Sequence, residues 1–165
     1  MRSLAFAFAV ALAACPALAQ SAPKKPELKI DIVVALKQAK VVFNLDHLAF
    51  AGKEPFGLLY MRLMHERFAA DRTKSDVVAI VHGPAGYWAL GDAAFNRVRR
   101  TRGGNPYAKE IAALQAKGFR FELCGQTARD NGWGNADLLP GILVNSGANF
   151  RIIELVQAGF VQIQP

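Results

Sequence analysis

Apolar residues occur along the chain in short runs separated by longer amphipathic stretches, a pattern that indicates strands alternating with helices. Residues 39–45 (AKVVFNL) and 76–81 (DVVAIV) are rich in β-branched, apolar side chains, as strands buried on both faces of a parallel sheet are. Residues 119–124 (FRFELC) predict a third core strand and residues 141–144 a fourth. Two further apolar stretches predict a short extra strand at 30–36 and a final strand at 160–163.

The segments between these strands carry signals for helix ends. Pro55 opens a helix whose apolar residues recur at near-helical spacing, at Phe56, Leu59, Tyr60, Leu63 and Phe68. Asn105 is suited to an N-cap and Pro106 to the first helical position, and Gly118 ends that helix. Shorter helices are expected at 93–98, 126–131 and 148–158, the last capped by Ser146, with a short strand or turn at 87–90.

This order of elements predicts one α/β domain over residues 28–165. Its mostly parallel sheet of about five strands is expected to be covered by helices on both faces. Residues 20–27 (QSAPKKPE) are expected to be a polar tether in front of the domain.

Residues 1–19 are typical of a targeting segment. A single arginine precedes an uncharged apolar run over 4–14, and 17–19 (ALA) is an A-x-A cleavage site, so we expect secretion to the periplasm. Residues 12–15 (LAAC) also resemble a bacterial lipobox, which would make Cys15 a lipid-bearing N-terminus, but the site at 17–19 favours ordinary cleavage. No other apolar run is long enough to span a membrane.

The composition adds a basic surface, because 20 Lys and Arg exceed 13 Asp and Glu. Such a surface favours anions or acidic partners. Four arginines fall within 97–102, where a solvated loop is the ordinary interpretation and an anion site the alternative. No nucleotide or nucleic-acid motif is present, and export argues against nucleic acid as a target. The His and Cys residues lack metal-ligand spacing, so we expect neither a metal nor another cofactor.

Polar residues gather at the C-terminal ends of the predicted strands, where open α/β sheets place their binding sites. Asp46 follows the first core strand, His82 the second and Asn145 the fourth, while Cys124 ends the third. His82 could act as a base or donor, or could satisfy loop carbonyls. Asp46 could be a polar wall of the site, although turn and cap roles are commoner for such residues. All four are expected at one edge of the sheet.

Cys124 is the strongest candidate for chemistry. A thiolate at a strand tip where a helix begins would be stabilised by the exposed N–H groups and dipole of that helix. After cleavage Cys124 would be the only cysteine left, so it could not be half of an internal disulfide. Within the next turn Thr127 could donate to the thiolate and Arg129 could add positive potential. The alternatives are a small buried hydrophobe, a capping hydroxyl and a solvated charge.

Several motifs, in this order and spacing, resemble the DsrE/DsrF-like family in its exported branch: 78–85 (VAIVHGPA), 105–106 (NP), 118–124 (GFRFELC), 137–141 (DLLPG) and 157–160 (QAGF). The resemblance covers the chain from about residue 39 onward. It implies a three-layer, doubly wound, flavodoxin-like sheet and homo-oligomers, often trimers or hexamers. In the sulfur-relay members a cysteine at the place of Cys124 carries a persulfide and passes sulfur between proteins.

These expectations lead to one principal hypothesis for function and two alternatives. The principal hypothesis is an exported protein that binds or transfers sulfane sulfur as a persulfide on Cys124, with donor and acceptor proteins or small thiols as partners. It would be a sulfur carrier rather than a turnover enzyme. The first alternative is a non-catalytic oligomeric binding or assembly module with a structural Cys124. The second is a rhodanese-like sulfurtransferase or a phosphatase-like enzyme, because Cys124 and Arg129 frame a C-x4-R segment.

Overall fold

The computed structural model describes residues 26–165, and the chain divides into two units, Met1–Val33 and Val34–Pro165. The predicted targeting segment and tether residues 20–25 lie outside the described residues. Residues 26–37 contain neither helix nor strand, so the strand predicted at 30–36 is wrong. An extended segment becomes a strand only where its backbone pairs with a neighbouring strand, and residues 30–36 take part in none of the strand pairs of the described chain.

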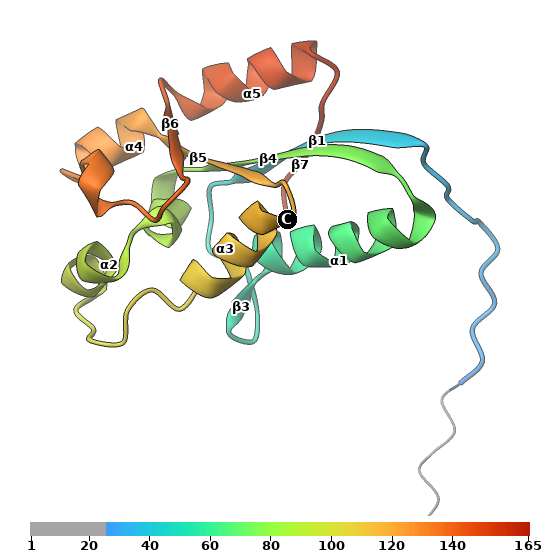
Figure 1. Ribbon diagram of the computed structural model, residues 1–165, viewed down its shortest axis with the longest axis horizontal. Helices are drawn as coiled ribbons and strands as arrows, with labels where there is room; N and C mark the ends of the chain where they lie inside the picture. Colours follow the sequence, from blue (N-terminus) through green and yellow to red (C-terminus); the bar gives the residue numbers. More distant parts are fainter. Residues whose placement is uncertain (1–25) are drawn as a thin grey trace, which may run out of the picture. The chain divides into compact units, whose positions relative to one another are not determined.

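A five-stranded parallel sheet forms the middle layer of the folded unit (Figure 1). Its strand order is β6-β5-β4-β1-β7, and every neighbouring pair is parallel. The strands are β1 (Gln38–Leu45), β4 (Lys74–Val81), β5 (Arg120–Cys124), β6 (Leu143–Asn145) and β7 (Val161–Ile163). A small antiparallel hairpin, β2 (Phe50–Ala51) with β3 (Glu54–Pro55), stands apart from this sheet.

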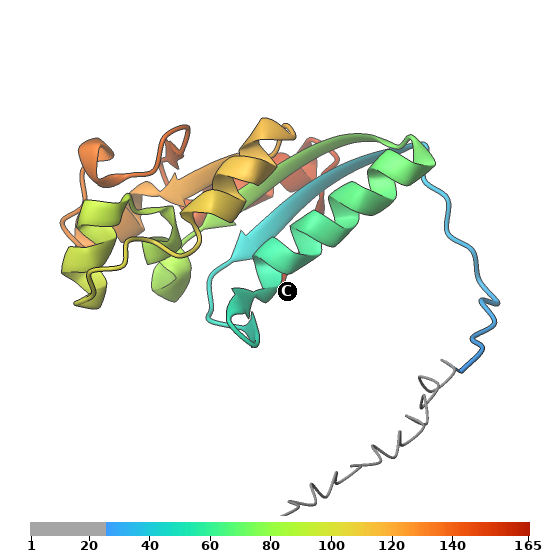
Figure 2. The same ribbon diagram turned by 60° about the horizontal axis from the view of Figure 1, so that its bottom comes forward.

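Five α-helices and two short 3₁₀ helices complete the described part of the chain. They are α1 (Phe56–Asp71), η1 (Gly83–Ala89), α2 (Asp92–Arg99), α3 (Ala108–Ala116), α4 (Gly125–Asp130), η2 (Asn135–Asp137) and α5 (Ala148–Gln157). Helix α5 covers one face of the sheet, while α1 and α3 lie side by side on the other (Figures 1 and 2). The predicted three-layer α/β fold is therefore confirmed. None of the described helices has the length and hydrophobicity needed to cross a membrane.

Three local predictions require correction. The fourth strand, predicted in the core at 141–144, begins at Leu143 and lies at the sheet edge, where Leu143 and Val144 are exposed. Residues 87–90 belong mainly to η1 rather than to a strand or a simple turn. The last helix has Gly147 as its N-cap residue and no side-chain cap, so Ser146 does not cap it.

Helix α1 begins after Pro55 as predicted, and Phe68 of the predicted apolar stripe is buried, but the rest of the buried face differs from the one expected. Its buried residues are Gly57, Leu58, Met61 and Phe68. Tyr60 and Leu63, which the spacing assigned to the core, are 42% and 47% exposed. Gly57 explains the difference, because a Cβ there would lie only 2.5 Å from Leu45 Cδ2. The missing side chain lets the helix approach the sheet along its glycine face.

Asn105 acts as the predicted cap, although on a turn that precedes helix α3. Its Oδ1 accepts a hydrogen bond from the Tyr107 N–H at 2.9 Å. Its Nδ2 donates to the carbonyl oxygens of Trp88 and Leu90 at 2.9 and 2.6 Å. The buried amide therefore ties the start of α3 to the segment that follows β4.

The sheet separates two apolar clusters of unequal size. The larger lies under α1, α2 and α3 and includes Phe43, Trp88 and Phe121. The smaller lies under α5 and consists of Val42, Val78, Ile80, Cys124, Ala148, Ile152, Leu155 and Phe160. The candidate thiol therefore belongs to the α5 side of the sheet.

Candidate functional site

The parallel sheet brings the predicted strand-end residues to one edge. Cys124 pairs in register with Asn145 on β6, and Leu45 pairs with Val81, which immediately precedes His82. The His82 ring Nε2 lies 2.7 Å from Asn44 Oδ1, which links the ends of β4 and β1. The order β5-β4-β1 places His82 between Cys124 and the end of β1.

Cys124 lies where two helices begin. It is the residue immediately before α4, and its backbone is extended there. Its Sγ also accepts a hydrogen bond from the N–H of Ala148, the first residue of α5, at 3.3 Å. Both helices therefore direct N–H groups and the positive end of their dipoles toward the sulfur.

The surroundings of Cys124 lower the pKa of its thiol. Burial by itself raises this pKa, but the backbone N–H groups of Thr127, Ala148 and Gln126 and the Thr127 hydroxyl stabilise the thiolate and outweigh burial. Thr127 Oγ1 accepts a hydrogen bond from the Gly83 N–H at 3.0 Å. Its oxygen is therefore already partnered, which leaves the hydroxyl proton available to the sulfur.

A cavity of about 390 Å³ opens beside the thiol. Its lining includes His82, Gln126, Thr127, Asn149 and the ring of Phe150, which is 79% exposed. Burial lowers the pKa of His82, and the nearby Asp46 carboxylate offsets only part of this effect. Because no Asp or Glu side chain lines this cavity, only a thiolate on Cys124 itself would repel an anionic sulfur compound there.

Three predicted site residues lie outside this cavity. Asp46 accepts hydrogen bonds from His47 at 2.7 Å and Gln164 at 2.8 Å. Burial raises the pKa of Asp46, but these two bonds and the charge interactions with His82 and His47 together lower it. Asn145 donates from Nδ2 to Glu122 Oε2 at 3.2 Å. Arg129 donates to Gln126 Oε1 at 2.9 Å and lines a separate cavity of about 170 Å³.

A charged network next to the thiol involves residues that were not among the predicted site residues. Glu122, two positions before Cys124 on β5, is 4% exposed. Arg151 of α5 donates hydrogen bonds to both carboxylate oxygens of Glu122, from Nε to Oε2 at 3.0 Å and from Nη2 to Oε1 at 2.9 Å. Arg151 Nη1 also donates to Glu154 Oε2 at 2.8 Å. In the sequence Glu122 alternates with Phe121 and Leu123, as a solvent-facing strand residue would, so no local signal marked it.

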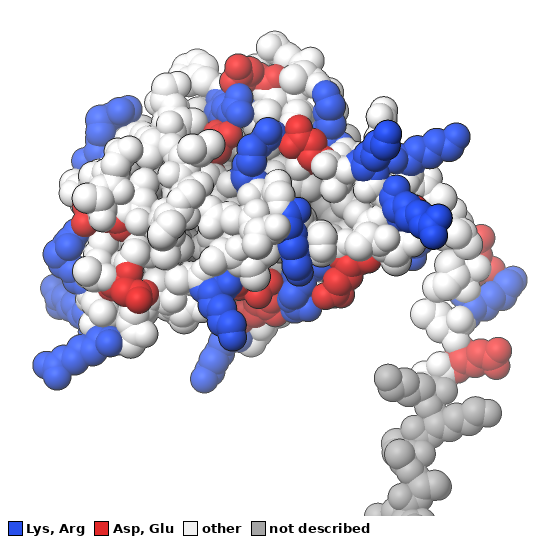
Figure 3. All heavy atoms as spheres, in the orientation of Figure 1, with Lys and Arg blue, Asp and Glu red and all other residues white. Residues whose placement is uncertain are grey.

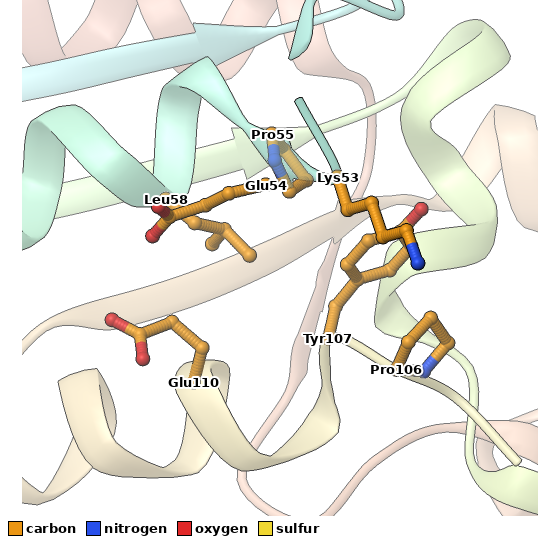
Figure 4. A pocket seen from close by; sticks show the side chains of 7 residues that line it. All are labelled: Lys53, Glu54, Pro55, Leu58, Pro106, Tyr107 and Glu110. Carbon is orange, nitrogen blue, oxygen red and sulfur yellow. The ribbon is translucent and has the colours of Figure 1, made fainter. Parts of the chain in front are cut away.

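A second cavity, of about 270 Å³, lies between the β2-β3 hairpin and the start of α3. Figure 4 shows Lys53 and Glu54 of the hairpin with Tyr107 and Glu110 of the α3 region around it. The two carboxylates are not a free acid–base pair, because Arg62 contacts Glu54 at 3.1 Å and Glu110 at 3.7 Å. The geometry therefore favours the Cys124 cavity as the functional site.

Two of the four arginines within 97–102 make contacts inside the fold, while Arg100 and Arg102 are exposed. Arg97 pairs with Asp137 at 2.8 Å, and the Arg99 guanidinium lies 4.5 Å from the centre of the Tyr87 ring. On the face in Figure 3, Lys and Arg side chains are scattered with carboxylates between them. Among the described residues, no group of three or more His, Cys, Asp or Glu side chains could hold a metal ion.

Comparison with known proteins agrees with this architecture. The model of the DsrE/DsrF-like family matches residues 7–165. The chain belongs to the DsrE/DsrF-like family. Its fold resembles that of MTH1491, a protein of unknown function from Methanobacterium thermoautotrophicum, with a TM-score of 0.61 and 21% identity over 77% of this chain and 99% of that one.

The structure of the ychN protein from E. coli is also similar. It has a TM-score of 0.55 and 15% identity over 77% of this chain and 99% of that one. At these identities the two structures establish the fold alone. No curated protein matches this DsrE/DsrF-like chain.

Proposed function

We propose that this DsrE/DsrF-like protein acts in sulfur relay by binding or transferring sulfane sulfur as a persulfide on Cys124. The observation that carries the proposal is the position of the sulfur, which accepts the Ala148 N–H at the start of α5 and lines a cavity of about 390 Å³. A thiol of lowered pKa in such a place provides the thiolate that sulfur transfer requires.

The proposed reaction conserves atoms and electrons. The Cys124 thiolate attacks the terminal sulfur of a donor persulfide, R–S–SH. A new S–S bond forms at Cys124, the donor S–S bond breaks, and the donor leaves as the thiolate R–S⁻. In the handover an acceptor thiolate attacks the outer sulfur and regenerates the Cys124 thiolate. The N–H groups that stabilise the resting thiolate also stabilise Cys124 as a leaving group.

The proposed setting is the periplasm, because residues 1–19 have the pattern of a cleavable signal. Residues 20–165 contain no second cysteine, so the acceptor must be another molecule, a protein or a small thiol. A homo-oligomer, a trimer or hexamer, belongs to the same proposal by virtue of the family.

Mass spectrometry after incubation with inorganic polysulfide tests the proposal. The peptide containing Cys124 should gain the mass of one sulfur atom and lose it on addition of a small thiol. A Cys15→Ala variant should behave identically, and a Cys124→Ser variant should show no adduct. If Cys124 is alkylated normally yet never gains sulfur, the proposal fails.

One observation favours the alternative of a structural Cys124 in a binding or assembly module. The residue is only 6% exposed and packs in the cluster under α5. A Cys124→Ala variant that keeps full function in vivo would support this alternative. The rhodanese-like alternative has less support, because Arg129 binds Gln126 within α4 and lines a different cavity from Cys124.

A further inference from the structure

Glu122 and Cys124 occupy alternate positions of β5 and therefore face the same side of the sheet. That side is covered by α5, which contacts both residues. The Ala148 N–H meets the sulfur at 3.3 Å, and one turn later the Arg151 guanidinium meets the Glu122 carboxylate at 2.9 Å. The first turn of α5 is thus held to β5 at two adjacent points.

The contact between Glu122 and Arg151 has the geometry of a rigid clamp. Arg151 uses Nε and Nη2 on the two carboxylate oxygens, at 3.0 and 2.9 Å. Such a bidentate pair fixes orientation as well as distance. Asn145 of β6 adds a third donor to the carboxylate at 3.2 Å. The clamp therefore determines how α5 is rotated and shifted relative to the strand that carries the thiol.

The same pair also controls the local charge. Two residues along a strand span about 7 Å, so an unpaired Glu122 carboxylate would oppose a second negative charge on the sulfur. The Glu122 side chain is 5% exposed, so solvent screens it little. The other charged or titratable groups on elements around the thiol are His82 after β4, Arg129 and Asp130 on α4, Glu154 on α5, and, at the N-terminal ends of β4 and β5, Lys74, Asp76 and Arg120. Among them only Glu154 contacts the pair, and it does so through Arg151.

We propose that Glu122 and Arg151 are positioning residues for Cys124. The pair aims the first amide of α5 at the sulfur, and Arg151 cancels a carboxylate charge that would otherwise disfavour the thiolate. This inference rests on the proposed function of Cys124 as a sulfur-accepting thiolate. It assigns a role to two residues outside the cavity that the substrate would occupy.

The rate of Cys124 alkylation by iodoacetamide, measured against pH in the full chain, tests the inference. Mass analysis of the Cys124 peptide keeps Cys15 out of the measurement. Arg151→Met leaves the carboxylate unpaired, so the thiol pKa should rise and alkylation at pH 7 should slow on the order of tenfold. Glu122→Gln removes the carboxylate charge and keeps Arg151, so the pKa should fall and alkylation should quicken.

These opposite signs distinguish the charge effect from simple loosening of α5, which would shift both variants in the same direction. Arg151→Lys retains the charge but loses the bidentate contact, so its alkylation profile should lie between those of Arg151→Met and the wild type. In the double variant Glu122→Gln/Arg151→Met, the rate of Cys124 alkylation at pH 7 should be closer to that of the wild type than in Arg151→Met. Single variants that move the profile in the same direction, or not at all, overturn the inference.

If Arg151→Met does not fold, the thiol pKa of Glu122→Gln alone tests the inference. This variant should fold, because the Gln amide has the shape of the Glu carboxylate. Asn145 Oδ1 is buried and has no hydrogen-bond partner among residues 26–165, so a turned Asn145 amide can accept a hydrogen bond from the new Gln side chain. An unchanged or raised pKa in this variant counts against the inference. A wild-type profile with an ordinary thiol pKa would instead undermine the proposed function itself, so the two failures are distinguishable.

Discussion

Gly125→Ala tests how closely β6 must approach the start of α4. A Cβ at this position would lie 2.7 Å from the backbone oxygen of Asn145 and 3.4 Å from Val144 Cγ1. Heavy atoms in favourable contact are about 3.5 Å apart, so the chain would have to move by roughly 0.8 Å. The nearest atom belongs to the backbone of β6, so no side-chain rotation relieves the clash.

The expected cost follows from two opposing effects. Overpacking of this kind costs about 1–3 kcal/mol. Replacing Gly by Ala restricts the unfolded chain, which offsets about 0.4–1 kcal/mol. Taking the middle of each range, the net loss of stability should be about 1.3 kcal/mol, or a fall in Tm of roughly 3–6 °C for a domain of this size.

Thermal unfolding followed by circular dichroism measures this loss. Gly134→Ala is the matched control, because a Cβ there meets nothing within 4 Å and its φ of −102° suits any residue. The control should keep or slightly raise its Tm. Equal Tm values for the two variants would refute the reasoning. Because Cys124 precedes Gly125 and pairs with Asn145, its alkylation at pH 7 should also slow in Gly125→Ala alone.

Two other predictions concern the cavity beside the thiol. Thr127→Val removes the acceptor of the Gly83 N–H and a donor to the Cys124 sulfur. The free energy of unfolding should therefore fall by about 1–2 kcal/mol, and the pKa of the Cys124 thiol should rise. An unchanged melting curve and alkylation profile would contradict this. His82 should titrate by NMR below its usual value of about 6.5, because burial disfavours the charged ring. Since the unfolded state then takes up the proton first, the contribution of His82 to stability is present above about pH 6.5 and is lost as the pH falls through the folded pKa. A midpoint at or above 6.5 would show that this reasoning is wrong.

The central strands could be predicted because a parallel sheet buries them on both faces. Val77 to Val81 are all at most 3% exposed, so an uninterrupted apolar run was a reliable signal. Helix α1 shows where such counting fails. Its contact face is organised around Gly57, a residue with no side chain for a hydrophobic pattern to register. A prediction based on the spacing of large apolar residues therefore placed Tyr60 and Leu63 in the core, whereas both are exposed.

The Cys124 site could be predicted only as far as local sequence determines it. A thiol at a strand tip before a helix follows from neighbouring residues alone, and so does the donor at Thr127. The Ala148 N–H and the Arg151 guanidinium come from a helix more than twenty residues further along the chain. Their approach depends on strand order, which periodicity does not specify. Glu122 reads as a solvent-facing residue of an alternating strand until both faces of that strand are known to be covered.

The unequal clusters on the two faces of the sheet bear on how Cys124 is reached by other molecules. Helix α5 buries only Ala148, Ile152 and Leu155 of its own residues, whereas the opposite face is sealed by three helices and a Trp. Proteins open locally in units whose cost follows the apolar contacts they lose. Detachment of α5 would bare the sulfur while the larger cluster stayed intact. Local opening of α5, rather than global unfolding, should therefore limit the rate at which bulky reagents modify this thiol. Hydrogen exchange of the α5 amides measures that opening.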